Sequence, residues 1–261
     1  MHGKFLIEAV ENQNINSDGI ILDDNVFTTL AFVNLTKDGE RSFAFARKPG
    51  ADTMIGYKEV DTELLQNTKV FHVGSLSLTD EPARSTTFQA VKCAKNAGAV
   101  ISYDPNYRAP LWNNEKTAIE RMRSMLPFAD MIKLSDEETA LLTPYENPDE
   151  AANYLLDHGI KIVAVTLGKE GVLICNRKDH QKVSGFSSQV VDTTGAGDSF
   201  WGGFMSQFVK SKLNPEDCSI EELKKFARYG NAVASLCIEK KGGILSIPEE
   251  KETFKRLQLG V

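Results

Sequence analysis

The 261-residue sequence predicts an α/β protein, a central mostly parallel sheet flanked by helices in three layers. Two observations predict this class. Strand-like and helix-like segments alternate from residue 69 to residue 166, which is typical of parallel strands joined by helical connections. Ahead of them, residues 18–50 hold short strand-like segments with no helix between them, as at a sheet edge or in a flap over a cleft.

The N-terminal part is predicted as one helix followed by three strands. Residues 2–14 have apolar side chains at helical spacing and predict an amphipathic helix. Residues 19–22, 28–35 and 41–46 predict strands, and the K-D-G-E run at 37–40 is typical of a hairpin turn.

The alternating region predicts a parallel sheet covered on both faces. Its strands are predicted at residues 70–75, 99–104, 131–134 and 161–166. Its helices are predicted at residues 81–97, 114–126, 135–142 and 149–158. Ligands of such a sheet bind beyond the carboxyl ends of the strands, so we expect the chemistry in the loops that follow them.

Composition narrows the classes of function. With 41% hydrophobic and 25% charged residues the chain is typical of a globular protein with one large domain, or one domain and a small appendage. A net charge of −6 argues against nucleic-acid and anionic-membrane partners. The four cysteines form no C-x-x-C pair, which fits reduced, buried thiols in a cytoplasm.

The run V-D-T-T-G-A-G-D-S-F-W-G-G-F at residues 191–204 predicts a loop that breaks into a helix. Gly195 and Gly197 leave their amide groups uncovered. Phe200, Phe204 and Phe208 are four residues apart, as on the buried face of a helix. Uncovered amides at a helix N-terminus bind anions, and phosphate is the usual one.

A carboxylate inside this anion site indicates a base, because it would otherwise oppose the ligand. Asp198 is therefore a candidate to take a proton from a hydroxyl beside a phosphate. The alternatives are a plain glycine turn and a helix N-cap. The chain has no G-x-x-x-x-G-K-[ST] motif, and Phe200 replaces the third glycine of a dinucleotide fingerprint.

The run D-T-T-G-A-G-D-S-F at residues 192–200 resembles the C-terminal signature of the ribokinase/PfkB family of carbohydrate kinases. The resemblance implies a ribokinase-like fold for residues 1–261, with residues 18–50 as a β lid. It implies that Asp198 is the catalytic base. The amides of Gly195, Ala196 and Gly197 would stabilise the transferred phosphoryl group.

Two further runs are similar to family motifs. D-P-N-Y-R at 104–108 could be only a rigid turn, but it resembles a fructokinase loop, which would place Asp104, Asn106 and Arg108 at the sugar or the phosphate. The second run is K-L-S-D-E-E at 133–138, in which Glu138 completes a capping box with Ser135. The family has N-x-x-E here, and its Glu organises hydrated Mg²⁺.

The nucleotide site implied by the resemblance lies near the signature. T-L-G-K-E-G at 166–171 is a possible β-turn and resembles the family's nucleotide loop. It would contribute Thr166, Gly168 and Gly171, together with Gly197 of the signature. Asn231 stands where an adenine contact is expected, although a polar residue on a surface helix is an equal alternative.

The run K-K-G-G-I-L-S-I-P at residues 240–248 resembles the family's closing segment, where oxygen atoms hold a monovalent cation, and K⁺ is the candidate ion. A plain glycine turn is the alternative. The implied ligands, mostly through main-chain oxygen, are Asp192, Thr194, Cys237, Lys240, Gly242 and Ser246.

The function implied is transfer of the γ-phosphate of ATP, with Mg²⁺, to a sugar hydroxyl, and the substrate indicated is D-fructose. Other substrates left open are 2-keto-3-deoxygluconate, ribose and a nucleoside. Small-molecule partners alone are expected, and two copies would pair through the lid.

A second class of function stays open at this point. The family's first strand and its G-G-x-x-x-N segment have no counterpart here, since residues 2–6 resemble the helix that follows them. A partial chain that binds nucleotide without sugar-dependent turnover is therefore the alternative, and we expect poor solubility or weak unfolding cooperativity for the chain alone.

Overall fold

The structure is a computed structural model that describes residues 1–35 and 41–260, and it divides into two compact units. Unit 1 comprises residues 1–101 and 105–128, and unit 2 comprises residues 102–104 and 129–261. Strand β4 (Val100–Asp104) gives its first two residues to unit 1 and its last three to unit 2.

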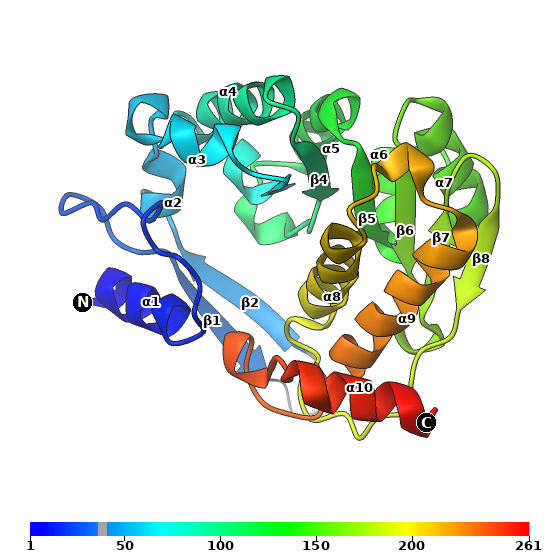
Figure 1. Cartoon of the computed structure of the whole chain (residues 1–261). Helices are drawn as coiled ribbons and strands as arrows, with labels where there is room; N and C mark the ends of the chain where they lie inside the picture. The colour runs from blue at the N-terminus through cyan, green and yellow to red at the C-terminus, as the bar shows by residue number, and fades with distance from the viewer. Residues whose placement is uncertain (36–40, 261) are drawn as a thin grey trace. The chain divides into compact units, whose positions relative to one another are not determined.

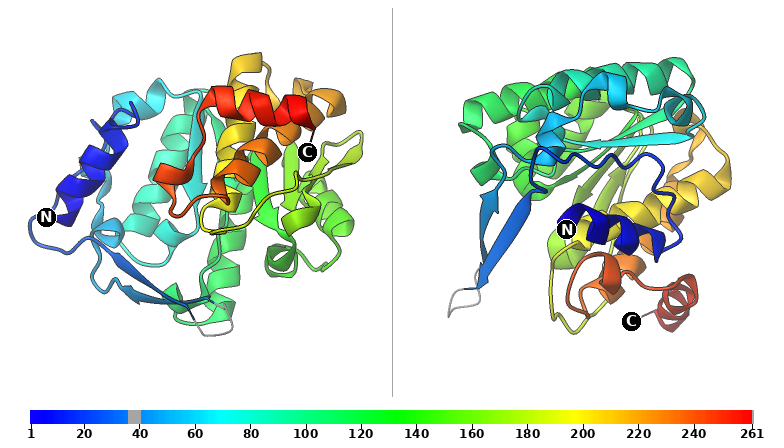
Figure 2. Two further views of the ribbon diagram at one scale, coloured as in Figure 1. Left: turned by 90° about the horizontal axis from the view of Figure 1, so that it is seen from below. Right: turned by 90° about the vertical axis from the view of Figure 1, so that its left-hand side faces the viewer.

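The small sheet of unit 1 is a two-stranded ribbon, drawn in blue in Figures 1 and 2. Strands β1 (Leu30–Leu35) and β2 (Arg41–Ala46) pair antiparallel, from Leu30 opposite Ala46 to Leu35 opposite Arg41. The strands expected at 28–35 and 41–46 are confirmed. The turn expected at 37–40 lies outside the described residues, and the lid function of 18–50 stays a prediction.

The first helix matches its prediction in place but not in burial. Helix α1 (His2–Glu11) buries none of its residues, and Phe5 and Leu6 are exposed. The strand expected at 19–22 is wrong, because this segment follows a turn and pairs with no strand among the described residues. Apolar residues alone do not make a strand, since the backbone also needs a partner for its hydrogen bonds.

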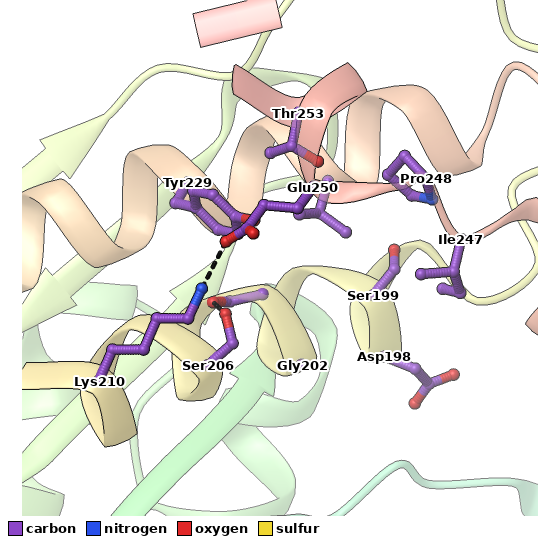
Figure 3. Close-up of a pocket in the computed structure, with 12 residues that line it drawn as sticks. Asp198, Ser199, Gly202, Ser206, Lys210, Tyr229, Ile247, Pro248, Glu250 and Thr253 are labelled. Carbon is purple, nitrogen blue, oxygen red and sulfur yellow. Dashed lines mark hydrogen bonds and ion pairs between the residues drawn. The ribbon is translucent and has the colours of Figure 1, made fainter. Parts of the chain in front are cut away.

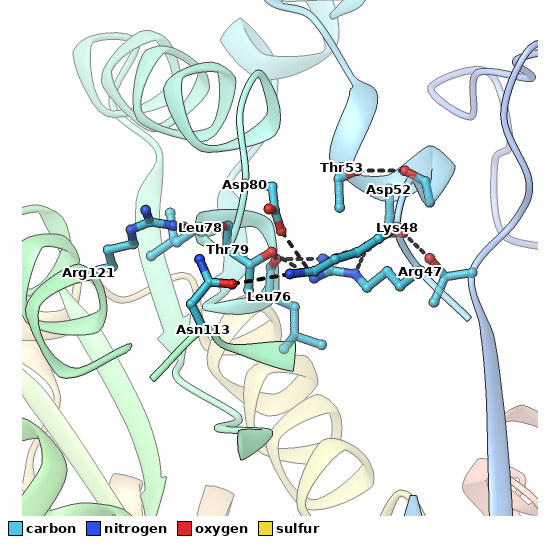
Figure 4. Close-up of polar contacts among 12 residues, drawn as sticks. Arg47, Lys48, Asp52, Thr53, Leu76, Leu78, Thr79, Asp80, Asn113 and Arg121 are labelled. Carbon is cyan, nitrogen blue, oxygen red and sulfur yellow. Dashed lines mark hydrogen bonds and ion pairs between the residues drawn. The ribbon is translucent and has the colours of Figure 1, made fainter. Parts of the chain in front are cut away.

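Arg47 holds the end of β2 against the rest of unit 1 (Figure 4). Its side chain is buried, and its Nε donates to Asp52 Oδ2 at 2.7 Å. Nη1 donates to Thr79 Oγ1 and Nη2 to the Leu76 carbonyl, each at 2.7 Å. A planar guanidinium with several fixed donors suits such a junction. The base of the ribbon is thus fastened to the turn after β3.

Between residues 70 and 126 unit 1 confirms the predicted strand and helices with β3 (Val70–Gly74), α4 (Ala83–Asn96), the start of β4, and α5 (Glu115–Met125). Helices α2 (Ala51–Met54) and α3 (Thr62–Gln66) were not predicted. Short 3₁₀ turns lie at Tyr57–Glu59, Leu76–Leu78, Ala109–Leu111 and Leu126–Phe128. Leu78, Val91 and Met122 are fully buried within this unit.

Unit 2 contains most of the large sheet, whose strand order is β3-β4-β5-β6-β7-β8. Strands β4, β5 (Met131–Ser135) and β6 (Ile162–Thr166) are parallel, as predicted. Strands β7 (Val172–Cys175) and β8 (His180–Val183) extend it antiparallel and were not predicted. They form because the turn after β6 reverses the chain without a helix.

Helices cover both faces of this part of the sheet (Figure 1). Helix α7 (Pro148–Asp157) lies on one face, and α8 (Ala196–Ser211) and α9 (Ile220–Cys237) lie on the other. The predicted helix at 135–142 is a 3₁₀ turn (Asp136–Glu138) and one turn of α6 (Thr139–Leu142). Helix α10 (Glu250–Leu259) is the last element described. The 3₁₀ turns of this unit also include Gly168–Glu170, Pro215–Asp217 and Ile244–Ser246. Within the residues described, no helix is long and apolar enough to cross a membrane.

Helices α8 and α9 approach closely at two glycines. A Cβ atom on Gly203 would lie 3.0 Å from Val233 Cγ2 and 3.1 Å from the Cα of Gly230. Gly202, its neighbour in α8, has no atom within 4 Å of such a Cβ position. Of the two neighbouring glycines in α8, packing therefore requires Gly203 and not Gly202.

We expect Gly203→Ala to lower the free energy of unfolding by about 1–3 kcal/mol, because the added methyl group overpacks the contact with α9. Gly202→Ala is the matched control and is expected to raise it by about 1 kcal/mol through helix propensity. Urea unfolding followed by circular dichroism measures both, and equal effects would contradict the close approach.

Candidate active site

The loop at residues 192–195 turns sharply into α8, as the sequence predicts. Gly195 is the N-cap and has φ +78°, a left-handed conformation that favours glycine. The Ala196 amide donates to the Thr193 carbonyl at 3.2 Å, so of the three amides predicted to meet phosphate this one already has a partner. Among the described residues no backbone acceptor is found for the amides of Gly195 and Gly197. These two donors stay available at the positive end of a 16-residue helix.

Aromatic packing fixes this helix in unit 2. Phe200, Phe204 and Phe208 are buried, which confirms the predicted face. Trp201 stacks on Phe204 with ring centroids 4.8 Å apart, and its Nε1 donates to Ser102 Oγ at 2.8 Å. The first turn of α8 is therefore held beside the end of β4, the strand that carries Asp104.

The predicted base, Asp198, is exposed in the first turn of α8. A cavity of about 380 Å³ between α8, α9 and the start of α10 includes Asp198 in its lining (Figure 3). Figure 3 shows the Asp198 carboxylate directed away from the Lys210–Glu250 ion pair at the far side of this cavity. The cavity is therefore not the place where this carboxylate would meet a hydroxyl.

Asp104, predicted at the sugar or the phosphate, is buried and paired. Its Oδ2 accepts a hydrogen bond from Lys133 Nζ at 2.7 Å, and both side chains are under one-tenth exposed. Burial raises the pKa of Asp104 to about 6. Lys133 opposes this rise in pKa, whereas the charges of Glu138 and Asp198 add to it. Asp104, Glu138 and Asp198 thus share one electrostatic environment.

The other members of the D-P-N-Y-R loop belong to unit 1. Asn106 is half-buried with φ +47°, a conformation that asparagine tolerates. The Pro105 carbonyl accepts a hydrogen bond from the Ser75 amide at 3.2 Å. Arg108 Nη1 donates to the Tyr107 carbonyl at 3.0 Å. The loop is therefore built within unit 1 as a fixed turn, and its ligand contacts stay a prediction.

Glu138 forms the predicted capping box. Its Oε2 accepts from the Ser135 amide at 2.8 Å and from Ser135 Oγ at 3.2 Å. One orientated carboxylate fits Mg²⁺, which keeps several waters and binds through one or two carboxylates and the phosphates of its substrate. Among the residues that the structure describes, no three His, Cys, Asp or Glu side chains form a metal cluster.

The T-L-G-K-E-G run connects β6 to β7. Gly168 has φ +55° and open space around it, whereas a Cβ on Gly171 would lie 2.1 Å from the Val183 carbonyl. Gly171 is thus required where this turn meets β8. Thr166 Oγ1 donates to the Leu134 carbonyl at 3.4 Å. Whether these residues bind nucleotide stays a prediction.

Asn231 is buried on α9 and is not a surface residue. Its Nδ2 donates to the carbonyls of Val183 and Ser184, at 3.0 Å each. The amide ties α9 to the end of β8, which is a structural role that the sequence did not indicate. A contact with adenine would have to use the rest of this side chain, and it stays a prediction.

The predicted cation ligands come together between two loops of unit 2. Asp192 Oδ1 accepts from the Thr194 amide at 2.8 Å, and its Oδ2 accepts from the Gly242 amide at 3.2 Å. Ser246 Oγ lies 2.6 Å from the Gly242 carbonyl and 2.9 Å from Cys237 Sγ. Lys240 is exposed, and its Nζ lies 3.8 Å from Glu252. The cluster is rich in oxygen, which suits a hard cation.

A mostly parallel sheet, a β ribbon and the loop at residues 192–197 (the anion loop) beside buried carboxylates define the class as a phosphotransferase of the ribokinase-like fold. Residues 1–250 match the pfkB family carbohydrate kinase profile. The chain is 39% identical over 259 residues to fructokinase-2 of Solanum lycopersicum, covering 99% of this chain and 78% of that protein.

Solved structures agree with this sequence match. A fructokinase of Xylella fastidiosa with bound ATP has a TM-score of 0.90 and 29% identity, over 98% of this chain and 81% of that one. A fructokinase double mutant of Vibrio cholerae O395 with fructose, ADP and potassium has a TM-score of 0.88 and 28% identity, with the same coverages. The chain belongs to the pfkB family of carbohydrate kinases, and the expected fold class is confirmed.

Lys133 is the residue of this site that sequence reasoning missed. It lies in the middle of β5, and all four residues from Met131 to Leu134 are buried. A lysine inside a buried strand was the available signal, because a buried ammonium requires a partner.

Titration of Asp104 predicts a pH-dependent stability. Its pKa is raised from 3.8 to about 6, so the native state binds this proton more tightly than the unfolded chain does. The associated stability is complete below pH 4 and is lost as the pH rises through 6, by about 3 kcal/mol. We expect wild type to lose most of this amount relative to Lys133→Met/Asp104→Leu between pH 4 and pH 7, measured by urea unfolding.

The matched control removes an exposed ion pair, Lys224–Glu221, through Lys224→Met/Glu221→Leu. Its stability difference from wild type should stay nearly constant over the same pH range. A wild-type curve parallel to that of the Lys133→Met/Asp104→Leu variant would contradict the raised pKa of Asp104.

Proposed function

We propose that this protein transfers the γ-phosphate of ATP to a hydroxyl of D-fructose, giving fructose 6-phosphate. The observation that carries the proposal is the first turn of α8, where uncovered amides and the exposed Asp198 carboxylate occur together. The names of the relatives support the substrate, since a fructokinase is among the curated matches and solved fructokinases hold fructose, ADP or ATP.

In the proposed reaction Asp198 takes the proton of the attacking sugar hydroxyl. The amides of Gly195 and Gly197 donate to the phosphoryl oxygens, where negative charge grows during transfer. Asp104 and the unit 1 residues Asn106 and Arg108 would orient the sugar, while Thr166, Gly168, Gly171 and Asn231 would border the nucleotide. Mg²⁺, held through water by Glu138, would neutralise charge on the phosphates.

Purified protein with MgATP and KCl should form ADP in the presence of D-fructose at a rate well above that without sugar. Ribose, a nucleoside and 2-keto-3-deoxygluconate are the comparison substrates, and a faster rate with any of them would replace fructose in the proposal. ADP binding without any sugar-dependent turnover would favour the alternative, a chain that binds nucleotide without catalysis.

Replacing Asp198 tests the base. Asp198→Asn should lower kcat about 10²- to 10⁴-fold, because the amide cannot accept the hydroxyl proton. Its affinity for ADP, measured by calorimetry, should stay close to that of wild type. The matched control is Asp157→Asn, an exposed aspartate at the end of α7. A turnover of Asp198→Asn equal to that of the control would rule out the base assignment.

The oxygen-rich cluster between residues 192 and 246 is proposed to bind K⁺ near the anion loop. Replacing KCl by choline chloride at equal ionic strength should therefore lower kcat/KM. Asp192→Asn should raise the K⁺ concentration for half-activation about tenfold, because its one acceptor oxygen cannot accept from both of the amides that this carboxylate joins. Identical rates in both salts would refute the site.

Pairing of two copies through the β1–β2 ribbon and a cytoplasmic location stay predictions.

A further inference from the structure

Lys133 is a charged residue inside an apolar strand. Its neighbours in β5, Ile132 and Leu134, are fully buried, and its own side chain is 7% exposed. Burial of an ammonium group is costly unless a counter-charge compensates it. A lysine at this position is therefore expected to have a role that an apolar residue could not fill.

The ammonium of Lys133 lies between Asp104 and the anion loop. On one side it donates to Asp104 Oδ2 at 2.7 Å. On the other side, a Cβ atom on Gly197 would lie 3.0 Å from Lys133 Nζ and 3.6 Å from its Cε. Gly197 thus has no side chain at the place where the ammonium touches the loop. A unit positive charge therefore lies within contact distance of Gly197, one of the two residues whose amides are uncovered.

Asp104 has one oxygen that is not used by this pair. Its Oδ1 is buried and has no hydrogen-bond partner among the described residues. A buried carboxylate oxygen normally accepts a hydrogen bond, so an unsatisfied one indicates a missing donor. A hydroxyl group of a bound substrate is such a donor, and a phosphate, which offers mainly acceptors, is not.

The surrounding charges are otherwise negative. Asp104 shares its environment with Glu138 and Asp198, which both act against its ionisation. Tyr103, the preceding residue on β4, is buried and its pKa is raised well above the usual value. Lys133 is the positive charge that favours ionisation of Asp104 in this setting. Without it, the pKa of Asp104 would rise further, and the helix amides would have to offset the nearby carboxylates.

We propose that Lys133 is a positioning residue for phosphoryl transfer. It holds Asp104 so that one carboxylate oxygen is free for a hydroxyl of the acceptor, and it places a positive charge beside the anion loop at Gly197. This proposal rests on the proposed function for its substrate. In this proposal Asp104 binds the acceptor hydroxyl. Lys133 orients Asp104 for that hydroxyl and also attracts the phosphate. Loss of either residue should therefore give a different pattern of effects.

The first experiment compares Lys133→Met, Asp104→Asn and the double variant in the full chain. Lys133→Met should bind ADP about tenfold more weakly and lose about 10²-fold in kcat/KM for fructose. Asp104→Asn should bind ADP as wild type does and lose mainly in the KM for fructose. In the double variant the loss in kcat/KM should be well below the product of the single losses, because both act on one hydrogen-bonded unit.

The second readout is the pH profile of kcat/KM for fructose. We expect an acid limb near pH 6 in wild type, from ionisation of Asp104. Lys133→Gln should move this limb upward by about 1 pH unit or more, because the carboxylate has lost its cation and still faces Glu138 and Asp198. A residue that only supports the fold would change the rate but leave the limb in place.

Lys224→Met is the matched control, since it removes an exposed lysine from a surface ion pair. It should leave ADP affinity, fructose kinetics and the acid limb unchanged. Circular dichroism first establishes that each variant is folded. If Lys133→Met does not fold, Lys133→Gln/Asp104→Asn replaces it, because this pair keeps a hydrogen bond without buried charge. Its ADP affinity should still fall.

Three results would overturn the proposal: unchanged ADP affinity in a folded Lys133 variant, multiplicative losses in the double variant, or an acid limb that does not move. Failure of the proposed function looks different. Wild type would then show no fructose-dependent ADP formation, while ADP calorimetry on the same variants would still test the charge beneath the loop.

Discussion

The packing of α8 against the sheet is the constraint on which the site depends. The helix can present uncovered amides only if its first turn is held in place by something other than those amides. The aromatic face supplies this, with Phe200 and Phe204 buried and Trp201 bonded to Ser102. Because Ser102 and Asp104 lie on one strand, the same contact sets the distance between the anion loop and its nearest buried carboxylate.

Electrostatics explains why a buried lysine belongs in this arrangement. A kinase of this type must gather carboxylates to handle a hydroxyl proton and a metal, yet it must also attract a highly charged phosphate. Helix amides and their dipole favour the anion but act only over the first turn. A full charge in the low dielectric beneath the loop acts further. The cost of burying Lys133 is offset by Asp104, which is itself part of the site.

Local patterns in the sequence predicted those features that depend on neighbouring residues. The four-residue spacing of Phe200, Phe204 and Phe208 predicted the buried face of α8, and Ser135 with Glu138 predicted the capping box. The segment at 19–22 has the composition of a strand but no partner strand within residues 1–35 and 41–260, and pairing is a property of the whole fold.

The remaining features depend on contacts between distant parts of the chain. Asn231 bonds to carbonyls 47 and 48 residues away, and Lys133 meets Asp104 across 29 residues. A lysine in a buried strand indicates that it has a partner, but no pattern along the chain identifies that partner as Asp104, and none marks Asn231. The antiparallel β7 and β8 were missed for a related reason, since apolar runs do not reveal strand direction.

The two tryptophans of the chain lie one in each unit, and their surroundings differ. Trp201 is stacked and hydrogen-bonded under the anion loop, whereas Trp112 in unit 1 is buried with no partner for its Nε1 among the described residues. Indole emission responds to hydrogen bonding and to the polarity around the ring. The protein therefore has two intrinsic fluorophores. In a variant with Trp112 replaced, tryptophan emission would come from Trp201, next to the anion loop, alone.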